Sequence, residues 1–182
     1  MSIHDSILDT IGDTPIVRLH RLAPEGFDFG NSPTFITRED LSGITLIQRT
    51  GAGTQGAVRS QNAEVMLASS FVVANATVTF INNLRVSEVT FVVTGKTFSG
   101  GDEDLACAEY LEELLKGNSP DTRPFIKRVL DSRDALQHLD PREIAFPRSD
   151  LDYCTQIDKF DFAMPVRRED GKLIMHCVKP SI

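Results

Sequence analysis

The chain has few cysteines, no long apolar run and no cluster of basic residues. Its three cysteines, Cys107, Cys154 and Cys177, are far apart and odd in number, so neither a disulfide framework nor a metal-ligand spacing is predicted. Reduced thiols of this kind are typical of intracellular proteins. No apolar run approaches the length of a membrane span, and the opening residues lack the basic and apolar regions of a signal peptide. We therefore expect a cytoplasmic protein with no membrane association.

The balance of charge argues against a nucleic-acid-binding protein. The chain carries 19 basic and 26 acidic residues, with a formal net charge of −7. Binding to a phosphate backbone requires a basic patch, and the sequence contains none. Its 182 residues suffice for one domain with a sizeable core.

Short apolar runs alternate with amphipathic segments along the chain. We predict strands over residues 43–49, 64–68 and 89–93, and helices over residues 74–84, 105–116 and 124–130. This alternation is typical of a layered α/β domain with a mostly parallel or mixed sheet. The tail is expected to differ: a helix over 149–157 capped by Ser149, then a hairpin over 164–178 that turns at Asp170-Gly171.

Three acidic residues follow the most regular of the predicted strands. Asp102, Glu103 and Asp104 come after the strand over 89–93 and a glycine-punctuated loop, and they open the next helix. Ligands of α/β proteins bind at the carboxyl ends of strands, and carboxylates are the ligands that Mg²⁺ prefers. Acidic residues also suit a helix N-terminus for purely structural reasons. Both interpretations stay open for Glu103 and Asp104, and for Asp102 a helix cap is the preferred one.

Two further loops are candidates for binding an anion. The glycine-rich stretch 50–56 follows the predicted strand over 43–49 and could present backbone N–H groups to a phosphate. Its spacing matches neither a Walker loop nor a dinucleotide fingerprint, and from the stretch alone a tight turn that needs positive φ is the preferred explanation of the glycines. The stretch 26–33 contains Asn31 and Ser32, whose side chains could bond backbone or ligand.

The first residues resemble the opening of the cysteine synthase family, on the stretch Ser6-Ile-Leu-Asp-Thr-Ile-Gly-Asp-Thr-Pro-Ile-Val-Arg-Leu19. The resemblance stops near Pro24. Neither that family's Ser-Val-Lys-Asp-Arg type lysine motif nor its substrate loop is present, and the chemistry needs both. We therefore divide the chain into an opening segment, 1–24, and an α/β domain, 25–182, and we do not predict pyridoxal phosphate.

Residues 26–173 resemble the 2-phosphosulfolactate phosphatase family. Four ordered stretches carry the resemblance: Gly26-Phe-Asp-Phe-Gly-Asn-Ser-Pro33, Gln48-Arg-Thr-Gly-Ala-Gly-Thr-Gln-Gly56, Glu103-Asp-Leu-Ala-Cys107, and Asp158-Lys-Phe-Asp-Phe-Ala-Met-Pro-Val166 with Asp170-Gly171. The resemblance implies a three-layer α/β/α fold. It also implies Mg²⁺-dependent hydrolysis of a small anionic phosphate monoester, which in named members is 2-phosphosulfolactate.

The resemblance also implies roles for particular residues. Glu103 and Asp104 would be the catalytic and metal-binding carboxylates. The residues expected to bind the phosphate or sulfonate are Asn31, Ser32, Arg49, Thr50, Gly51 and Thr54. Arg49 would be the strongest charge-assisted donor, although a surface arginine is an equal alternative. A homodimer is left open.

One departure from the family pattern keeps a second hypothesis in view. Family members begin with a segment carrying an Asp-Val-Leu-Arg-Ala-Thr type motif, and the cysteine-synthase-like opening stands in its place. The alternative function is therefore a non-catalytic binding or assembly module. Cys107 is interpreted as a buried small residue, and the four histidines as structural or surface residues, because no Ser-His-Asp or Cys-His order is present.

Overall fold

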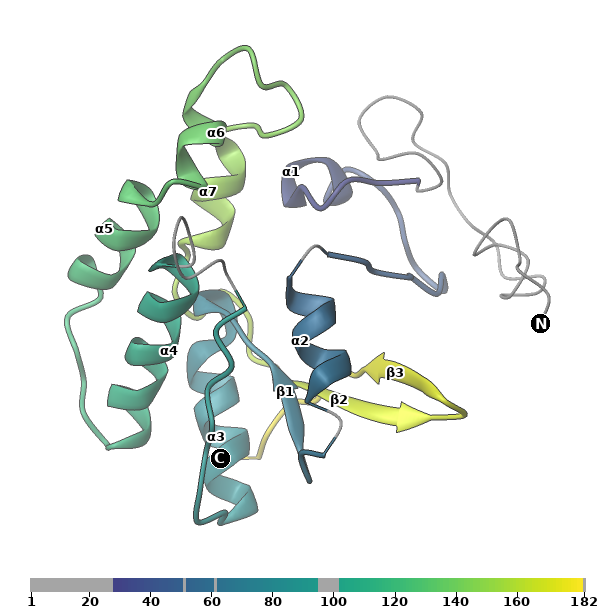
Figure 1. Ribbon diagram of the computed structural model, residues 1–182, viewed down its shortest axis with the longest axis vertical. Coiled ribbons are helices and arrows are strands. Elements are labelled where there is room, and N and C mark those ends of the chain that lie inside the picture. Colours follow the sequence, from purple (N-terminus) through teal and green to yellow (C-terminus); the bar gives the residue numbers. More distant parts are fainter. Residues whose placement is uncertain (1–27, 51, 61, 95–101, 182) are drawn as a thin grey trace.

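The computed structural model describes residues 28–50, 52–60, 62–94 and 102–181. It is a mixed α and β structure, and within these residues no helix is long and apolar enough to cross a membrane. Figure 1 shows a small sheet at one end and helices gathered beside it and above it. The helical elements are α1 (Pro33–Ile36), α2 (Gly53–Arg59), the 3-10 helix η2 (Phe71–Val73), α3 (Ala74–Leu84), α4 (Asp102–Leu115), α5 (Arg123–Asp131), α6 (Ala135–Leu139) and α7 (Ser149–Cys154).

The sheet of the described residues is antiparallel and has three strands in the order β1 (Met66–Ala68), β2 (Met164–Glu169), β3 (Lys172–Met175). Met66 pairs with Val166, so the first and second strands are a hundred residues apart in sequence. The predicted hairpin is confirmed: Asp170 and Gly171 join β2 to β3 with φ values of 48° and 76°. Positive φ at both central residues is the requirement of the two-residue turn whose twist suits a hairpin.

The core lies between α3, α4 and α5. Its buried residues share an apolar face on each helix, and they are Phe71, Ala74, Val78, Ala106, Tyr110, Leu111 and Val129. The ring centroids of Phe71 and Tyr110 are 5.6 Å apart, and those of Tyr110 and Phe125 are 5.4 Å apart. Such tilted aromatic pairs stabilise a core beyond the apolar area they bury. The predictions of α3 and α4 are confirmed, with α4 beginning three residues earlier than expected.

The C-terminal part of the chain holds the start of α3 in place. Asp158 accepts hydrogen bonds from the backbone N–H of Asn75 at 2.6 Å and from its side-chain amide at 2.7 Å. The backbone N–H of Phe160 donates to the carbonyl of Val72 at 2.9 Å. Because the first N–H groups of a helix have no partner inside it, Asp158 satisfies one of them from 83 residues away.

Two predicted strands are wrong. Residues 44–50 and 88–94 have no regular secondary structure, although their sequences have the apolar character of strands. Large apolar side chains in them are exposed: Leu46 is 57% exposed and Val92 is 58% exposed. A strand is stabilised by the strand beside it, and neither stretch has one among the described residues. The expected mostly parallel sheet is therefore corrected to a short antiparallel one, and the mixed α/β class is retained.

The prediction that Ser149 caps the N-terminus of α7 is also wrong. Ser149 is the first residue of α7 rather than the residue before it, and its hydroxyl lies 2.7 Å from the hydroxyl of Thr34 in α1. It therefore joins two helices instead of satisfying the N-terminus of its own.

Candidate active site

The three acids at the start of α4 have three different environments. Asp102 forms an ion pair with Arg128 of α5, in which Nη2 donates to Oδ1 at 2.6 Å. The guanidinium of Arg128 also bonds Glu109. The Arg128 hydrogen bonds lower the pKa of Asp102. Asp102, predicted as a cap, is thus a helical residue that ties α4 to α5.

Glu103 is the carboxylate that the structure leaves unsatisfied. Its Oε2 is buried and has no hydrogen-bond partner within the described residues. Burial raises the pKa of Glu103, and the nearby carboxylates of Asp134 and Asp104 raise it further. A buried oxygen without a partner is costly, and carboxylates held together favour either a proton or a cation between them.

Asp134 is the residue that sequence reasoning missed. It lies directly before α6, 31 positions after Glu103, in a stretch with no motif. Only the packing of α6 against α5 and of α5 against α4 brings it beside Glu103. No local signal in the sequence could have identified it.

Asp104 is held by Thr94, at the end of the extended stretch before the acidic loop. The backbone N–H and the hydroxyl of Thr94 both donate to Asp104 Oδ2, at 3.3 Å and 3.1 Å. Thr94 also lies against α2: a Cβ placed on Gly56 would be 2.5 Å from the Thr94 methyl carbon. The glycine-rich stretch and the acidic start of α4 are therefore in contact through one threonine.

The glycine-rich stretch uses its own polar groups to begin α2. The backbone N–H of Thr54 donates to Thr50 Oγ1 at 2.9 Å, and the Thr54 hydroxyl donates to the Thr50 carbonyl at 2.9 Å. Thr50 Oγ1 thus accepts an N–H group from the first turn of α2, and the hydroxyl of Thr54 is engaged by the backbone of Thr50. Arg49 is exposed and makes no side-chain bond or ion pair with the described residues. Gly51 lies outside the described residues.

Ser32 is also engaged by the protein. It is buried, and its hydroxyl donates to Asp150 Oδ1 at 2.8 Å. The same oxygen accepts the backbone N–H of Thr34 at 3.0 Å, so Asp150 of α7 fixes the beginning of α1. Neighbouring Asn31 is exposed and available. The described end of the expected loop, at Ser32, is therefore anchored on α7, and Asp150 was a second residue that the sequence did not reveal.

The thiol of Cys107 and the imidazole groups of His138 and His176 have structural roles. Burial raises the pKa of Cys107 to about 12, and Asp104 adds to the effect, which leaves the thiol protonated and unreactive. His138 Nδ1 lies 3.1 Å from the carbonyl of Pro147, and His176 Nε2 lies 2.8 Å from Glu169 Oε1. These environments agree with the interpretation of Cys107 as a buried residue and of His138 and His176 as structural residues, whereas His4 and His20 lie outside the described residues.

No complete metal cage is present in the part of the chain that the structure describes: no group of three or more His, Cys, Asp or Glu side chains is arranged to hold an ion alone. A Mg²⁺ site does not need one. Such sites commonly use one or two carboxylates, with waters and substrate phosphate oxygens completing the octahedron. The carboxylates of Glu103 and Asp104 fit this requirement in chemistry and number.

Comparison with known proteins identifies the family. The sequence profile of the 2-phosphosulpholactate phosphatase family matches residues 21–169 of this chain. The chain belongs to that family. The predicted resemblance to this family is thereby confirmed, and residues 1–20 and 170–182 lie outside the match.

Curated members of the 2-phosphosulfolactate phosphatase family give the extent of the similarity, and each is named a probable 2-phosphosulfolactate phosphatase. The protein of Bacillus subtilis (strain 168) is 30% identical over 149 residues, which cover 81% of this chain and 64% of that protein. The protein of Cyanothece sp. (strain PCC 7425) is 28% identical over 196 residues, covering 94% and 80%. That of Gloeobacter violaceus is 29% identical over 158 residues, covering 82% and 66%. The chain thus spans slightly less than two thirds of the Bacillus and Gloeobacter proteins.

Proposed function

We propose that this chain hydrolyses a small anionic phosphate monoester of the 2-phosphosulfolactate type, with Mg²⁺ bound by the carboxylates at the start of α4. The observation that carries the proposal is the buried, unpartnered Oε2 of Glu103 beside Asp134 and Asp104. Membership of the phosphatase family and the names of its relatives support the substrate class.

The carboxylates have oxygens available for a divalent cation. Glu103 offers its unpartnered Oε2. Asp104 uses Oδ2 for Thr94 and makes no bond through Oδ1 with the described residues. Asp134 lies beside Glu103 but does not complete a group of three ligands with them. A bound Mg²⁺ would supply Lewis-acid stabilisation of the charge on the phosphoryl group during transfer.

The chain's own residues hold this arrangement and bind the anion. Thr94 fixes the orientation of Asp104, and the Asp102–Arg128 ion pair fixes the start of α4 on α5. Arg49, Asn31 and Gly51 remain the residues we propose for direct contact with the phosphate or sulfonate. Ser32, Thr50 and Thr54 shape the loops that present them, because their own hydrogen-bonding groups are engaged by the protein.

Phosphate release tests this function. The full chain would be incubated with 2-phosphosulfolactate, with Mg²⁺ or with EDTA, and inorganic phosphate would be measured. We expect release with Mg²⁺ only, and a loss of roughly 100-fold in Glu103→Gln, because removing a group that holds or orients a metal lowers activity by this order. Glu112→Gln is the matched control, since Glu112 is an exposed acid of the same helix that pairs with Lys116. Full activity of Glu103→Gln would exclude the metal assignment.

We further propose that the protein adopts the three-layer α/β/α fold of the family. We also propose that it is located in the cytoplasm. The extended stretches 44–50 and 88–94 support the three-layer fold, because their exposed apolar side chains suit strands that gain neighbours. Pairing with a second copy would give a homodimer. Sedimentation analysis across a range of protein concentrations tests this, and a monomer at all concentrations would contradict the dimer.

A second candidate function is a non-catalytic binding or assembly module. It is favoured by the small size of the described sheet. Thermal melts separate the two candidates, because a ligand that binds only the native state raises its stability. A catalytic site predicts a higher melting temperature with Mg²⁺ plus phosphate, whereas the non-catalytic module predicts no change in the melting temperature.

A further inference from the structure

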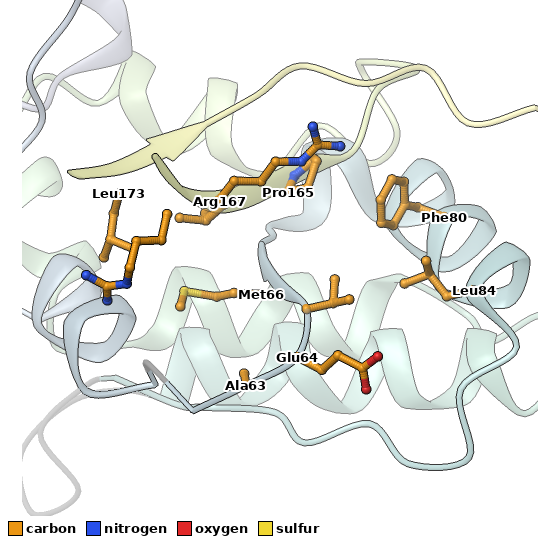
Figure 2. Close-up of a pocket in the computed structure, with 11 residues that line it drawn as sticks. Ala63, Glu64, Met66, Phe80, Leu84, Pro165, Arg167 and Leu173 are labelled. Carbon is orange, nitrogen blue, oxygen red and sulfur yellow. The ribbon is translucent and has the colours of Figure 1, made fainter. Parts of the chain in front are cut away.

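A groove lies between α3 and the sheet. Its cavity of about 390 Å³ is lined by residues of α3 and all three strands, and by the residues that lead into β1. Figure 2 shows Phe80 and Leu84 on one side, Met66 on the floor, and Pro165 and Arg167 on the strand above. Phe80 and Leu84 share a helix face because they are four residues apart, and Pro165 and Arg167 share a strand face because they are two apart.

The lining combines an apolar body with a positively charged border. Eight of the eleven lining residues are apolar, and the charged ones are Glu64, Arg167 and Arg168. Neither arginine side chain makes a hydrogen bond or ion pair with the described residues. Glu64 lies on the opposite wall from Arg167, and its carboxylate points away from that guanidinium (Figure 2). Two unpaired arginines beside one distant acid give this groove an excess of positive charge in a chain of net charge −7.

We propose that this groove binds a small organic carboxylate with a short apolar body. The guanidinium group of Arg167 takes the carboxylate, for which the planar fork of arginine is suited, and Arg168, which leaves the strand on the opposite face, adds positive charge at the border of the groove. Met66, Phe80, Leu84, Pro165 and Leu173 bury the hydrocarbon part. The volume is in the range of small-molecule sites, which combine an apolar lining with a few polar groups that orient the ligand.

The groove is distinct from the candidate active site. None of its lining residues belongs to α4, α5 or α6, which carry or adjoin Glu103, Asp104 and Asp134. The ligand class differs as well: the acidic site suits a cation together with a phosphate ester, whereas the groove suits an anion alone. The binding proposal therefore stands or fails independently of phosphatase activity.

Methyl-detected NMR of the full chain tests the proposal with hexanoate as the probe. We expect saturable shifts of the methyl resonances of Met66, Leu84 and Leu173. Hexan-1-ol, which has the apolar body without the charge, and acetate, which has the charge without the body, should each bind at least tenfold more weakly. Charge-assisted hydrogen bonds have energies that correspond to about this ratio.

Substitutions test the charged part and the apolar part of the groove separately. Arg167→Gln should weaken hexanoate binding about tenfold, whereas Arg148→Gln, an exposed arginine at the start of α7, should leave it unchanged. Leu84→Gln, at the half-exposed end of α3, should weaken hexanoate and hexan-1-ol equally. Equal binding of hexan-1-ol and hexanoate by the wild-type chain would overturn the proposal. So would hexanoate shifts confined to methyls outside the groove, or a groove closed by a second copy at every protein concentration.

Discussion

Thr94 donates two hydrogen bonds to a single oxygen of Asp104, one from its backbone N–H and one from its hydroxyl. This pair of bonds fixes the rotamer of Thr94, and with it the position of the methyl group that faces Gly56 in α2. Two regions with separate sequence signals, the glycine-rich stretch and the acidic helix start, are thus joined by one side chain.

Gly56→Ala should destabilise the protein. Alanine in a helix interior is ordinarily favoured over glycine by roughly 0.5–1 kcal/mol, but here its Cβ would lie 2.5 Å from the Thr94 methyl carbon. Because Asp104 holds the threonine hydroxyl, the methyl cannot rotate away without breaking a bond. We expect a net loss of about 1–2 kcal/mol in the free energy of unfolding, measured by urea denaturation.

Thr94→Ser is the matched partner for that experiment. It removes the methyl and keeps the hydroxyl for Asp104, so Gly56→Ala made in this background should cost little or should stabilise. Stabilisation by Gly56→Ala in the wild-type background would show that the helix and Thr94 separate freely.

Asp150→Ala should cost about 2–3 kcal/mol of stability. The change leaves the buried hydroxyl of Ser32 and the backbone N–H of Thr34 without an acceptor, and each such loss is expensive. Asp152→Ala is the control, because Asp152 is an exposed acid of the same helix, and it should change stability by less than about 0.5 kcal/mol. Equal effects of the two variants would contradict a special role for the Asp150 contacts.

Stability without metal should fall as the pH rises from about 4.5, the ordinary pKa of a glutamate carboxyl. Burial raises the pKa of Glu103 in the folded state, so between its unfolded and folded pKa values the folded state binds more protons. Stability then decreases with increasing pH. Thermal melts in EDTA from pH 4 to 8 should show this slope in the wild type and a reduced slope in Glu103→Gln. An unchanged slope would assign the effect to other groups.

The three thiols should react in a defined order at pH 8. Cys177 and Cys154 are both exposed, but partial burial of the thiol raises the pKa of Cys154, and burial raises that of Cys107 to about 12. Because the thiolate is the reactive form, a chromogenic disulfide reagent should modify Cys177 first and Cys107 only after unfolding. Mass spectrometry of peptides would identify the sites. Early modification of Cys107 would contradict its buried, protonated state.

Elements defined by local patterns could be predicted from the sequence. The apolar spacing of α3 and the Asp170-Gly171 turn both depend on neighbouring residues, and both were found. The strands predicted over 43–49 and 89–93 were wrong because strand formation depends on a partner strand, which the local sequence does not specify. Asp134 and Asp150 were missed for a related reason: their importance comes from contacts with residues 31 and more than 110 positions away.

The candidate site residues also divide into those that a local motif marks and those whose role depends on contacts within the fold. Glu103 and Asp104 were predicted as site residues because a family motif marks them, and the structure gives them different environments. Ser32, Thr50 and Thr54 have the polar groups of anion-binding residues, yet each donates or accepts bonds within the protein. Residue type alone cannot tell whether a hydroxyl is available to a ligand.

The position of β2 at the centre of the sheet has a consequence for biosynthesis. β1 leaves the ribosome about a hundred residues before its only partner among the described strands, since Met66 pairs with Val166. The helices α3, α4 and α5 can associate while translation continues, but the sheet can close only when synthesis is almost complete. Nascent chains stalled before residue 164 would therefore present an unpaired β1 to chaperones and proteases.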